Sequence, residues 1–534
     1  MGTTLTPPKA DKTAQVQRSV SFSAKHILVP AFFLLLLAIG LAVYKDYGLT
    51  WDDLAQVEIG ELNFKYVFQG DPALLSLKNR YYGPLFEMFL YAVTRGMPDR
   101  QLFLTRHLLT FAAFYVGVIF LYLLAKKITQ SWQAGLLAAL LLAATPSIFA
   151  HAFYNSKDIP FLTAFILAVF TLIRCLDHAA YCNIFLHALA SAVLIALRAP
   201  GILIFGLTLG LMGLYLVFHP GLQRRRGWFA RMLLYAAVTG GLVVLFWPVL
   251  WHDPASEFFN ALQQMSKFPW DGGTVLYRGS FVDAQALPWH YIPVWILITI
   301  PLPYLALAMV GGLKAGFAFL LRAGKILAPE KRNFLILAAW LILPVLAVIL
   351  FRSVLYDGWR QMFFVYPPLV ILAAQGAMAL FAVRFPKIPT KWLKAIAGLL
   401  VAAALVEPLF FMVRYHPHEN VYFNRLGGKD MARVKRHYEL DYWGLSYKQG
   451  LEHLLENDRS ENLKIYVFNR PGRINALILP EEQRKRLVYV DKPEEATYFL
   501  TNYRWHPQPY DYPDEIYAIR VGNASILSIF RLKP

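Results

Sequence analysis

Two adjacent carboxylates, Asp52 and Asp53, follow the first long apolar run of the chain in the sequence TWDDLAQ. Lys157 and Asp158 stand together in YNSKDIP, and Arg360 lies in YDGWRQ, each beside another apolar run. A partly buried carboxylate beside a like charge has a raised pKa and can accept a proton as a general base. A guanidinium matches the oxygens of a phosphate through two parallel hydrogen bonds. These residue types therefore suit acid–base chemistry beside a bound anion.

Glu58, Arg278 and His252 are further candidates for substrate contacts, because they fall in loops expected on the same side of the membrane as these groups. Simpler explanations exist for most of these residues. Aspartates are common at helix N-termini, as Asp52, Asp53 and Asp158 would be. Arg278 and Arg360, at a membrane boundary, would simply extend their charges to water. Glu58 would simply lie on the solvent-facing side of an interfacial helix. The sequence alone leaves both interpretations in place.

Several well-known chemical motifs are absent. The chain has no GxxxxGK[ST], HExxH, GxSxG, CxxC or DxD sequence. ATP-driven chemistry, zinc hydrolysis and a serine nucleophile elbow are therefore not indicated. No metal ligands and no cofactor are predicted, although a divalent cation stays an open alternative.

The composition is that of a membrane protein. Hydrophobic residues make up 57% of the 534 residues and charged residues only 16%, against about 25% charged in soluble domains. Apolar runs of about 20 residues recur along the chain, the length that crosses a bilayer as a helix. The net charge of +18 lies largely in short loops between these runs, where it orients membrane proteins. We therefore expect a lipid bilayer, and no nucleic acid, as a partner.

Eleven spans are expected. Residues 184–219 are interpreted as two short spans separated by a turn at Pro200, and the other nine runs as one span each. Basic residues before the first run predict a cytoplasmic N-terminus, which places the loops with the candidate residues outside. The runs are 28–44, 102–125, 131–150, 159–176, 184–219, 232–251, 291–313, 334–351, 362–383 and 395–413.

The last 120 residues have a different pattern. Short β-rich runs such as IYVFNR and SILSIFRL alternate with helix-like stretches such as SYKQGLEHLLEN, which is typical of a small α/β domain. The expected fold is thus an α-helical polytopic membrane protein with a small C-terminal α/β domain outside the membrane. We predict a cytoplasmic tail over 1–25, a membrane domain over 26–415 and the extracytoplasmic domain over 416–534.

The order of these motifs resembles the GT-C glycosyltransferases, and within them the family 39 branch of protein mannosyltransferases and bacterial aminoarabinose transferases. The resemblance covers about residues 25–415. It is carried by TWDDLAQ, FYNSKDIPFLTAFILAVF, WPVLWHDP with LPWHYIPVWILITIPLP, and YDGWRQMFFVYPPL. The resemblance implies a GT-C-like membrane domain and a multi-pass protein of the plasma (inner) membrane.

The resemblance also implies a reaction. A sugar on a polyprenyl phosphate would be transferred with inversion to an acceptor on the outer face. Asp52 matches the first, catalytic acid of the family's Asp-Glu pair, and Asp53 stands where the family has Glu. Asp158 matches the second acid of the outer loops. Arg360, with Arg278 and Lys157, would contact the lipid phosphate. The sugar and the acceptor, which the resemblance allows to be a protein, a lipid or a glycan, are not specified.

Two other function classes compete with this one. A lipid or sugar transporter, or a flippase, usually places charges near the middle of the membrane and has two similar halves. Here the charges fall at the ends of spans and no repeat is visible. A polysaccharide ligase or polymerase would use the same lipid-linked sugars. The acidic pair after the first span favours the family 39 interpretation.

Overall fold

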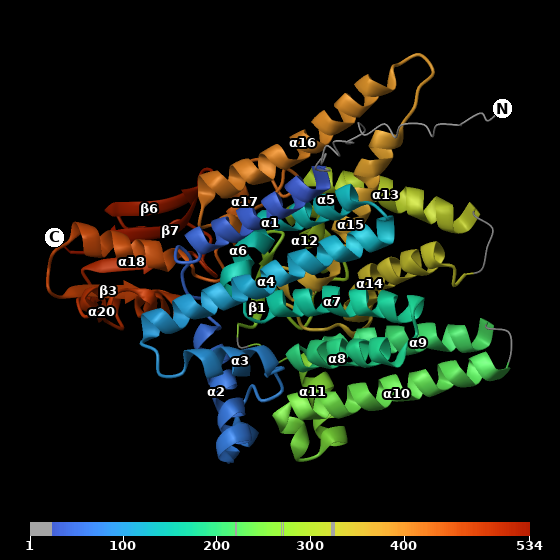
Figure 1. Ribbon diagram of the computed structural model, residues 1–534. Coiled ribbons are helices and arrows are strands. Elements are labelled where there is room, and N and C mark those ends of the chain that lie inside the picture. Colours follow the sequence, from blue (N-terminus) through green and yellow to red (C-terminus); the bar gives the residue numbers. More distant parts are fainter. Residues whose placement is uncertain (1–23, 219–221, 269, 271, 322–325, 534) are drawn as a thin grey trace, which may run out of the picture.

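The computed structural model describes residues 24–218, 222–268, 270, 272–321 and 326–533. The predicted N-terminal tail, 1–25, therefore lies almost entirely outside the described residues. Most of the chain is a bundle of apolar helices (Figure 1). They are α1 (Ala24–Val43), α4 (Asp99–Thr129), α5 (Trp132–Ala143), α6 (Pro146–Tyr154), α7 (Asp158–Asp177), α8 (Tyr181–Leu197), α9 (Ile202–Phe218), α10 (Leu222–Phe246), α12 (Tyr291–Thr299), α13 (Leu302–Leu321), α14 (Pro329–Phe351), α15 (Tyr366–Ala382) and α16 (Thr390–Tyr415).

The two ends of the bundle differ. The C-terminal strands lie at one end, and the last residues of α9 and α13 lie at the other (Figure 1). We call these the strand end and the basic end. The basic end carries Lys126 and Lys127 at the end of α4, and Lys331 at the start of α14. The short basic loops therefore gather on one side, as the sequence predicts.

The expected membrane architecture is confirmed. Within the described residues, nine helices are long and apolar enough to cross a membrane, and ten if a bent pair counts as one span. The expected eleventh is α8, which has 17 residues. At 1.5 Å per residue it reaches about 25 Å, the short limit of a spanning helix. The region 184–219 is two helices, as predicted, joined at a short 3-10 turn, η2 (Ala199–Gly201).

Two spans predicted as continuous helices are broken. The run 131–150 consists of α5 and α6, which are bent by 70° relative to each other. The run 291–313 is divided between α12 and α13 at Ile300. Pro146 and Pro301 follow these breaks. Proline lacks the N–H that continues a helix and disfavours helical backbone in the residue before it, so each proline starts a new helix.

Between α1 and α4, two helices lie at the strand end rather than in the bundle, α2 (Asp53–Gln69) and α3 (Leu85–Thr94). Between α10 and α12 lie a helix and a hairpin, namely α11 (Pro254–Ser266), β1 (Thr274–Tyr277) and β2 (Ser280–Asp283). Short 3-10 turns are η1 (Pro72–Ser76), η3 (Pro248–Trp251), η4 (Arg360–Val365) and η5 (Glu419–Val421). The segments that join the spans at the strand end thus have structure of their own.

The C-terminal region contains a mixed five-stranded sheet in the order β4-β3-β5-β7-β6. The pairs β3–β4 and β3–β5 are parallel, whereas β5–β7 and β6–β7 are antiparallel. The predicted small C-terminal α/β unit is confirmed. Its elements are α17 (Met431–His437), α18 (Ser446–Asn457), β3 (Leu463–Val467), α19 (Pro471–Ile474), η6 (Asn475–Ile478), α20 (Glu481–Arg484), β4 (Leu487–Tyr489), η7 (Pro493–Glu495), β5 (Tyr498–Thr501), β6 (Glu515–Val521) and β7 (Ala524–Arg531).

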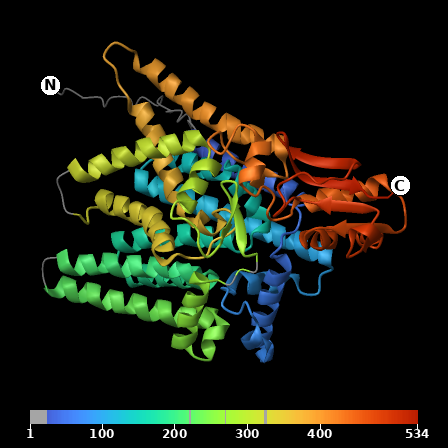
Figure 2. The same cartoon turned by 180° about the vertical axis from the view of Figure 1, so that it is seen from behind.

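The C-terminal unit contacts the hairpin of the loop between α10 and α12. Tyr277 of β1 forms an isolated β-bridge with Tyr438. Trp505 donates its indole N–H to the carbonyl oxygen of Thr274 at 3.3 Å. Figure 2 shows the hairpin beside the C-terminal elements. Segments more than 150 residues apart in the chain therefore form one wall at the strand end.

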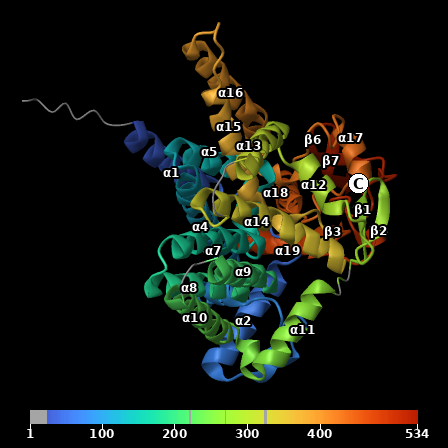
Figure 3. The same cartoon turned by 90° about the vertical axis from the view of Figure 1, so that its right-hand side faces the viewer.

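Helices α13 and α15 lie side by side (Figure 3) and pack through glycine. A Cβ on Gly376 would lie 2.0 Å from the carbonyl oxygen of Leu307, whereas the nearest atom to a Cβ on Gly312 would be 3.9 Å away. Small residues let membrane helices approach closely. The backbone contact at Gly376 leaves no space for a side chain.

Gly376→Ala should therefore lower the thermal midpoint of the purified protein, since overpacking costs roughly 1–3 kcal/mol. Gly312→Ala is the matched control and should be neutral or stabilising, because alanine favours a helix over glycine by about 1 kcal/mol. Thermal unfolding in detergent micelles measures both. Equal midpoints for the two variants would contradict the close approach of these helices.

Candidate functional site

Five charged side chains meet at the strand end, and we call them the charged cluster: Asp52, Lys157, Asp158, Arg198 and Arg360. Each stands where a helix begins or ends. Asp52 immediately precedes α2, Asp158 is the first residue of α7, and Arg360 is the first of η4. Side chains at such positions keep these five charges at the end of the bundle and out of its apolar middle.

The start of α7 explains why the Asp158 carboxylate is available to the cluster. The Asn155 side-chain oxygen accepts hydrogen bonds from the backbone N–H of Lys157 at 3.3 Å and of Asp158 at 2.9 Å. Asparagine commonly caps helices in this way. Asn155 rather than Asp158 accepts from these two N–H groups, and the Asp158 carboxylate faces the arginines and Asn155 Nδ2, which donates to it at 2.9 Å.

Arg360 lies at the centre of the cluster. Its Nη1 donates to Asp158 Oδ2 at 3.1 Å, and its Nη2 lies 3.7 Å from Asp52 Oδ2. Arg198 pairs with the other oxygen of Asp158. Lys157 Nζ donates to Asp52 Oδ2 at 2.6 Å. Three cations thus share two carboxylates, which leaves an excess of one positive charge.

The exposure of these groups differs sharply. The Arg360 and Asp158 side chains are 2% and 1% exposed, whereas Asp52 is 30% exposed. Arg360 therefore does not extend to the membrane surface as a lone interfacial arginine would. Asp52 is the member of the cluster that a reacting molecule can reach most readily.

The two adjacent aspartates have different environments. Although burial opposes ionisation of Asp52, the Lys157 and Arg360 cations hold its pKa below the ordinary value. Burial raises the pKa of Asp53 to about 6, even though the Thr50 N–H and hydroxyl donate to this carboxylate at 2.6 and 2.7 Å. Asp53 thus stabilises the turn before α2, while Asp52 faces the cluster.

The C-terminal unit covers the cluster. The Arg360 guanidinium lies 4.4 Å from the centre of the Trp443 ring. Arg504 pairs with Asp357 at 2.8 Å, and Asp357 lies 3.8 Å from Arg360 Nη2. Such stacking on an aromatic ring favours a cation most where water is excluded. The C-terminal unit therefore supplies the Trp443 ring above Arg360 and the Arg504 charge that pairs with Asp357 beside it.

Arg504 also packs the C-terminal unit against the segment that carries Asp52. Its guanidinium lies 5.4 Å from the ring of Trp51 and 4.5 Å from that of Trp505. Nearby, burial raises the pKa of Glu439 to about 7, although the Arg504 charge opposes this shift. The residue before Asp52 is thus in direct contact with the C-terminal unit.

Two histidines at the strand end, His151 and His290, are engaged in hydrogen bonds. His151 is buried, and its two ring nitrogens lie 2.9 Å from Asn155 Nδ2 and 3.2 Å from the Tyr442 hydroxyl. His290 Nδ1 lies 2.7 Å from the Tyr277 hydroxyl. In the part of the chain that the structure describes, no group of three histidine, cysteine, aspartate or glutamate side chains is placed to hold a metal ion.

Besides Asp53, which binds Thr50, three predicted site residues lie outside the cluster. Glu58 is on the exposed face of α2, and His252 is exposed after η3. Arg278 is exposed in the turn between β1 and β2, where its φ is +54°. They belong to the same end of the molecule as the cluster, but their side chains do not join it, because sequence position fixes the end of the bundle and not the direction of a side chain.

Several members of the site were not predicted as functional residues. Arg198, Asp357, Trp443 and Arg504 are not among the site residues predicted from the sequence. The sequence signal for Arg198 was its position in RAPG, where two spans meet. Asp357 lies in YDGWRQ, Trp443 in DYWGLSYKQG and Arg504 in TNYRWHP, and these sequences give no indication that the three residues meet.

One space adjoins the cluster, and a second is lined by residues near Arg198 in the chain. One, of about 20 Å³, is lined by Arg360, His151, Trp295 and Tyr442, which is room for about one water molecule. The other is an apolar hollow of about 340 Å³ between α9, α10 and α11. Ile195 and Ile202, which flank Arg198 in the chain, line this hollow. The space at Arg360 is therefore small, whereas the larger hollow is apolar and is lined by residues near Arg198 in the chain.

Replacing Asp158 should destabilise the protein more than replacing Asp52. Asp158→Asn would leave the charges of Arg198 and Arg360 without their shared buried carboxylate, and breaking a buried ion pair costs about 3–5 kcal/mol. Asp52→Asn removes a partly exposed charge and should cost clearly less. Thermal midpoints in detergent compare the two. An equally stable Asp158→Asn protein would contradict the central role of this carboxylate.

Comparison with known proteins extends the sequence resemblance. Residues 100–252 match the family model described as dolichyl-phosphate-mannose-protein mannosyltransferase. A search of curated proteins gave no significant match. Two similar solved structures are those of ArnT from Cupriavidus metallidurans, bound to undecaprenyl phosphate and in the apo state. The structure with undecaprenyl phosphate is 15% identical to this chain, with a TM-score of 0.49, and the alignment covers 95% of this chain and 98% of that one. The apo structure is 14% identical, with a TM-score of 0.48, and the alignment covers 94% of this chain and 98% of that one. For residues 100–252, the family match confirms the resemblance to the protein mannosyltransferases of the GT-C superfamily.

Proposed function

We propose that this protein is an inverting glycosyltransferase that moves a sugar from a polyprenyl phosphate to an acceptor on the outer face of the membrane. The observation that carries the proposal is the charged cluster, in which a reachable carboxylate lies beside three cations with an excess positive charge. The matched family model bears the name of an enzyme that uses a lipid-linked sugar.

The cluster suits each part of such a donor. Lys157, Arg198 and Arg360 provide charge for the phosphate, which becomes the leaving group and gains negative charge as its bond to the sugar breaks. The apolar hollow beside Arg198 suits the first isoprene units of the lipid. Asp52 takes the proton of the acceptor hydroxyl or amine, which then attacks the anomeric carbon from the side opposite the phosphate.

Phosphate binding would also activate Asp52. In the free protein Lys157 and Arg360 lower the pKa of Asp52, which makes this carboxylate a weak base. A bound phosphate would compete for the same two cations. Once they contact the phosphate, burial dominates and the pKa of Asp52 rises toward the range in which a carboxylate accepts a proton efficiently. Donor binding and base activation are thereby coupled.

The donor can enter only after a movement. The space beside Arg360 has room for about one water molecule, and Trp443 lies on the guanidinium. Trp443 belongs to the C-terminal unit, so a shift of this segment would uncover Arg360 without disturbing the helices of the bundle. We expect the tail to open for the donor and to exclude water when it closes.

The proposal is tested by sugar transfer from radiolabelled polyprenyl-phosphate sugars in proteoliposomes, with membrane extract as the acceptor. Asp52→Asn should lower turnover by roughly 10²–10⁴-fold, the usual contribution of a general base. Glu61→Gln, which removes a carboxylate of α2 that pairs with Lys65, is the control and should keep full turnover. Equal activity of Asp52→Asn and the native protein would refute the role of Asp52. Sugar or lipid crossing the bilayer without transfer would favour a transporter.

The pH dependence separates the two aspartates. Asp52 must be ionised to act as a base, and its pKa is lowered in the free protein, so kcat/KM should stay constant down to about pH 4. The acidic limb of kcat reports the complex with bound donor. It should lie at higher pH, because Lys157 and Arg360 then contact the phosphate and lower the pKa of Asp52 less.

Variants at both positions make this test decisive. A limb of kcat/KM near pH 6 that disappears in Asp53→Asn would assign the base to Asp53, whose pKa is about 6. Coincident acidic limbs of kcat and kcat/KM in the native protein would contradict the activation of Asp52 by phosphate. Both profiles come from initial rates over a range of donor concentrations.

A further inference from the structure

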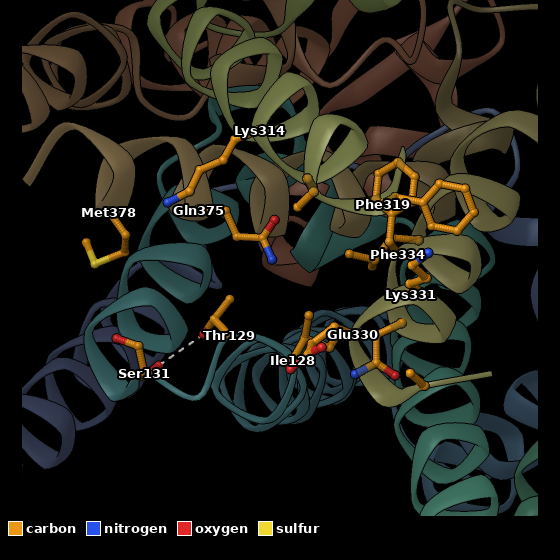
Figure 4. A pocket seen from close by; sticks show the side chains of 16 residues that line it. Ile128, Thr129, Ser131, Lys314, Phe319, Glu330, Lys331, Phe334, Gln375 and Met378 are labelled. Carbon is orange, nitrogen blue, oxygen red and sulfur yellow. Dashed lines mark hydrogen bonds between the residues drawn. The ribbon is translucent and has the colours of Figure 1, made fainter. Parts of the chain in front are cut away.

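A second cavity lies at the basic end of the bundle, away from the charged cluster. It has a volume of about 470 Å³ and is enclosed by α4, α13, α14 and α15 (Figure 4). This volume falls in the range of sites for small molecules, about 300–1,000 Å³. Nothing in the proposed transfer reaction uses this cavity.

The cavity has a polar rim and an apolar base. Lys314 and Lys331 lie on different sides of the hollow, and the Gln375 amide points into it (Figure 4). Phe334, Met378 and the buried Leu337 provide apolar lining. The division between charged and apolar groups matches an amphipathic ligand.

Among the residues that the structure describes, neither lysine forms an ion pair. The acid that attracts the neighbouring cations is Asp177, which pairs with Lys127 and Arg332, each at 2.6 Å. Within the described residues, no carboxylate lies within ion-pair distance of Lys314 or Lys331, and no hydrogen bond involves the Gln375 amide. Glu330 also lines the hollow, and Lys331 Nζ lies 5.5 Å from the centre of the Phe319 ring. The two ammonium groups therefore leave an excess of one positive charge beside the Gln375 amide.

The position of the cavity selects a membrane lipid. Helix α13 lines the cavity and exposes a neighbouring apolar face, in which Leu313, Phe317 and Leu320 are 56%, 59% and 73% exposed. In a spanning helix such a face lies against acyl chains. Basic pockets between membrane helices are known to hold the head groups of anionic lipids. A head group in the hollow would place its acyl chains along this face.

We propose that this cavity binds the phosphate head group of one anionic phospholipid, with Lys314 and Lys331 contacting the phosphate and the Gln375 amide donating to it. The acyl chains then run along α13 beside Phe317. Because the site is built from four helices, the bound lipid would also stabilise their packing at the basic end. The inference does not depend on the proposed transfer reaction.

The test uses the full-length protein and phosphatidylglycerol. Native mass spectrometry would count the lipid that stays bound after delipidation and stepwise addition. The double variant Lys314→Gln, Lys331→Gln should weaken retention by about tenfold or more, since hydrogen bonds to charged groups are strong. The control, Lys387→Gln with Lys391→Gln, removes two exposed charges near the start of α16, outside the cavity, and should stay within about twofold of the native protein.

A second variant and a second anion complete the test. Ala318→Phe fills the cavity without changing the charge and should reduce retention similarly, and it remains informative if the double variant unfolds. Phosphatidylglycerol should raise the thermal midpoint of the native protein more than phosphatidylcholine does. Equal retention by the cavity variants and the control would overturn the site. A midpoint raised as much by inorganic phosphate as by phosphatidylglycerol would show a free-anion site instead of a lipid site.

Discussion

The buried guanidinium of Arg360 is the group on which the strand end depends. Taking a cation out of water costs several kcal/mol unless carboxylates and hydrogen bonds compensate. Here the compensation comes from Asp158 at the start of α7, Asp52 before α2 and Asp357 in the loop before η4. Trp443 of the C-terminal unit covers the remaining face. One charge thereby requires four separate segments of the chain to meet.

This requirement explains why the site lies where it does. Charged side chains cannot be placed in the apolar part of the bundle without a large cost, so the cluster forms where helices begin and end. The loops there are not passive connections, since α2, α3 and the hairpin β1–β2 occupy them. Their packing excludes water from Asp158 and Arg360 but leaves Asp52 partly exposed. Buried, fixed charges beside a carboxylate that a reactant can reach are the arrangement that favours transition-state stabilisation.

The sequence predicts well the features that depend on the length of apolar runs. It predicts less well the features that depend on contacts between side chains of different segments. The spans, their separation at RAPG and the C-terminal unit follow from apolar runs and composition. The breaks before Pro146 and at Ile300 were not predicted, because apolar residues continue through both. Asp52, Lys157 and Arg360 could be chosen because each stands beside a span at the same end. Arg198 and Trp443 join the site only through packing, which the sequence does not reveal. Glu58 was predicted as a site residue, but its side chain points to water.

The contacts of the tail have a further mechanistic consequence. Arg504 ties Asp357 to the aromatic rings of Trp51 and Trp505, and Trp51 directly precedes Asp52. A movement of the C-terminal unit that uncovers Arg360 must therefore also act on the segment that carries the proposed base. The same contacts that close the site can align Asp52 when they form again. An active site shared between a membrane bundle and a water-exposed unit can in this way admit a lipid-linked molecule from the bilayer and still exclude water during the reaction, because the part that moves is not the part that is embedded.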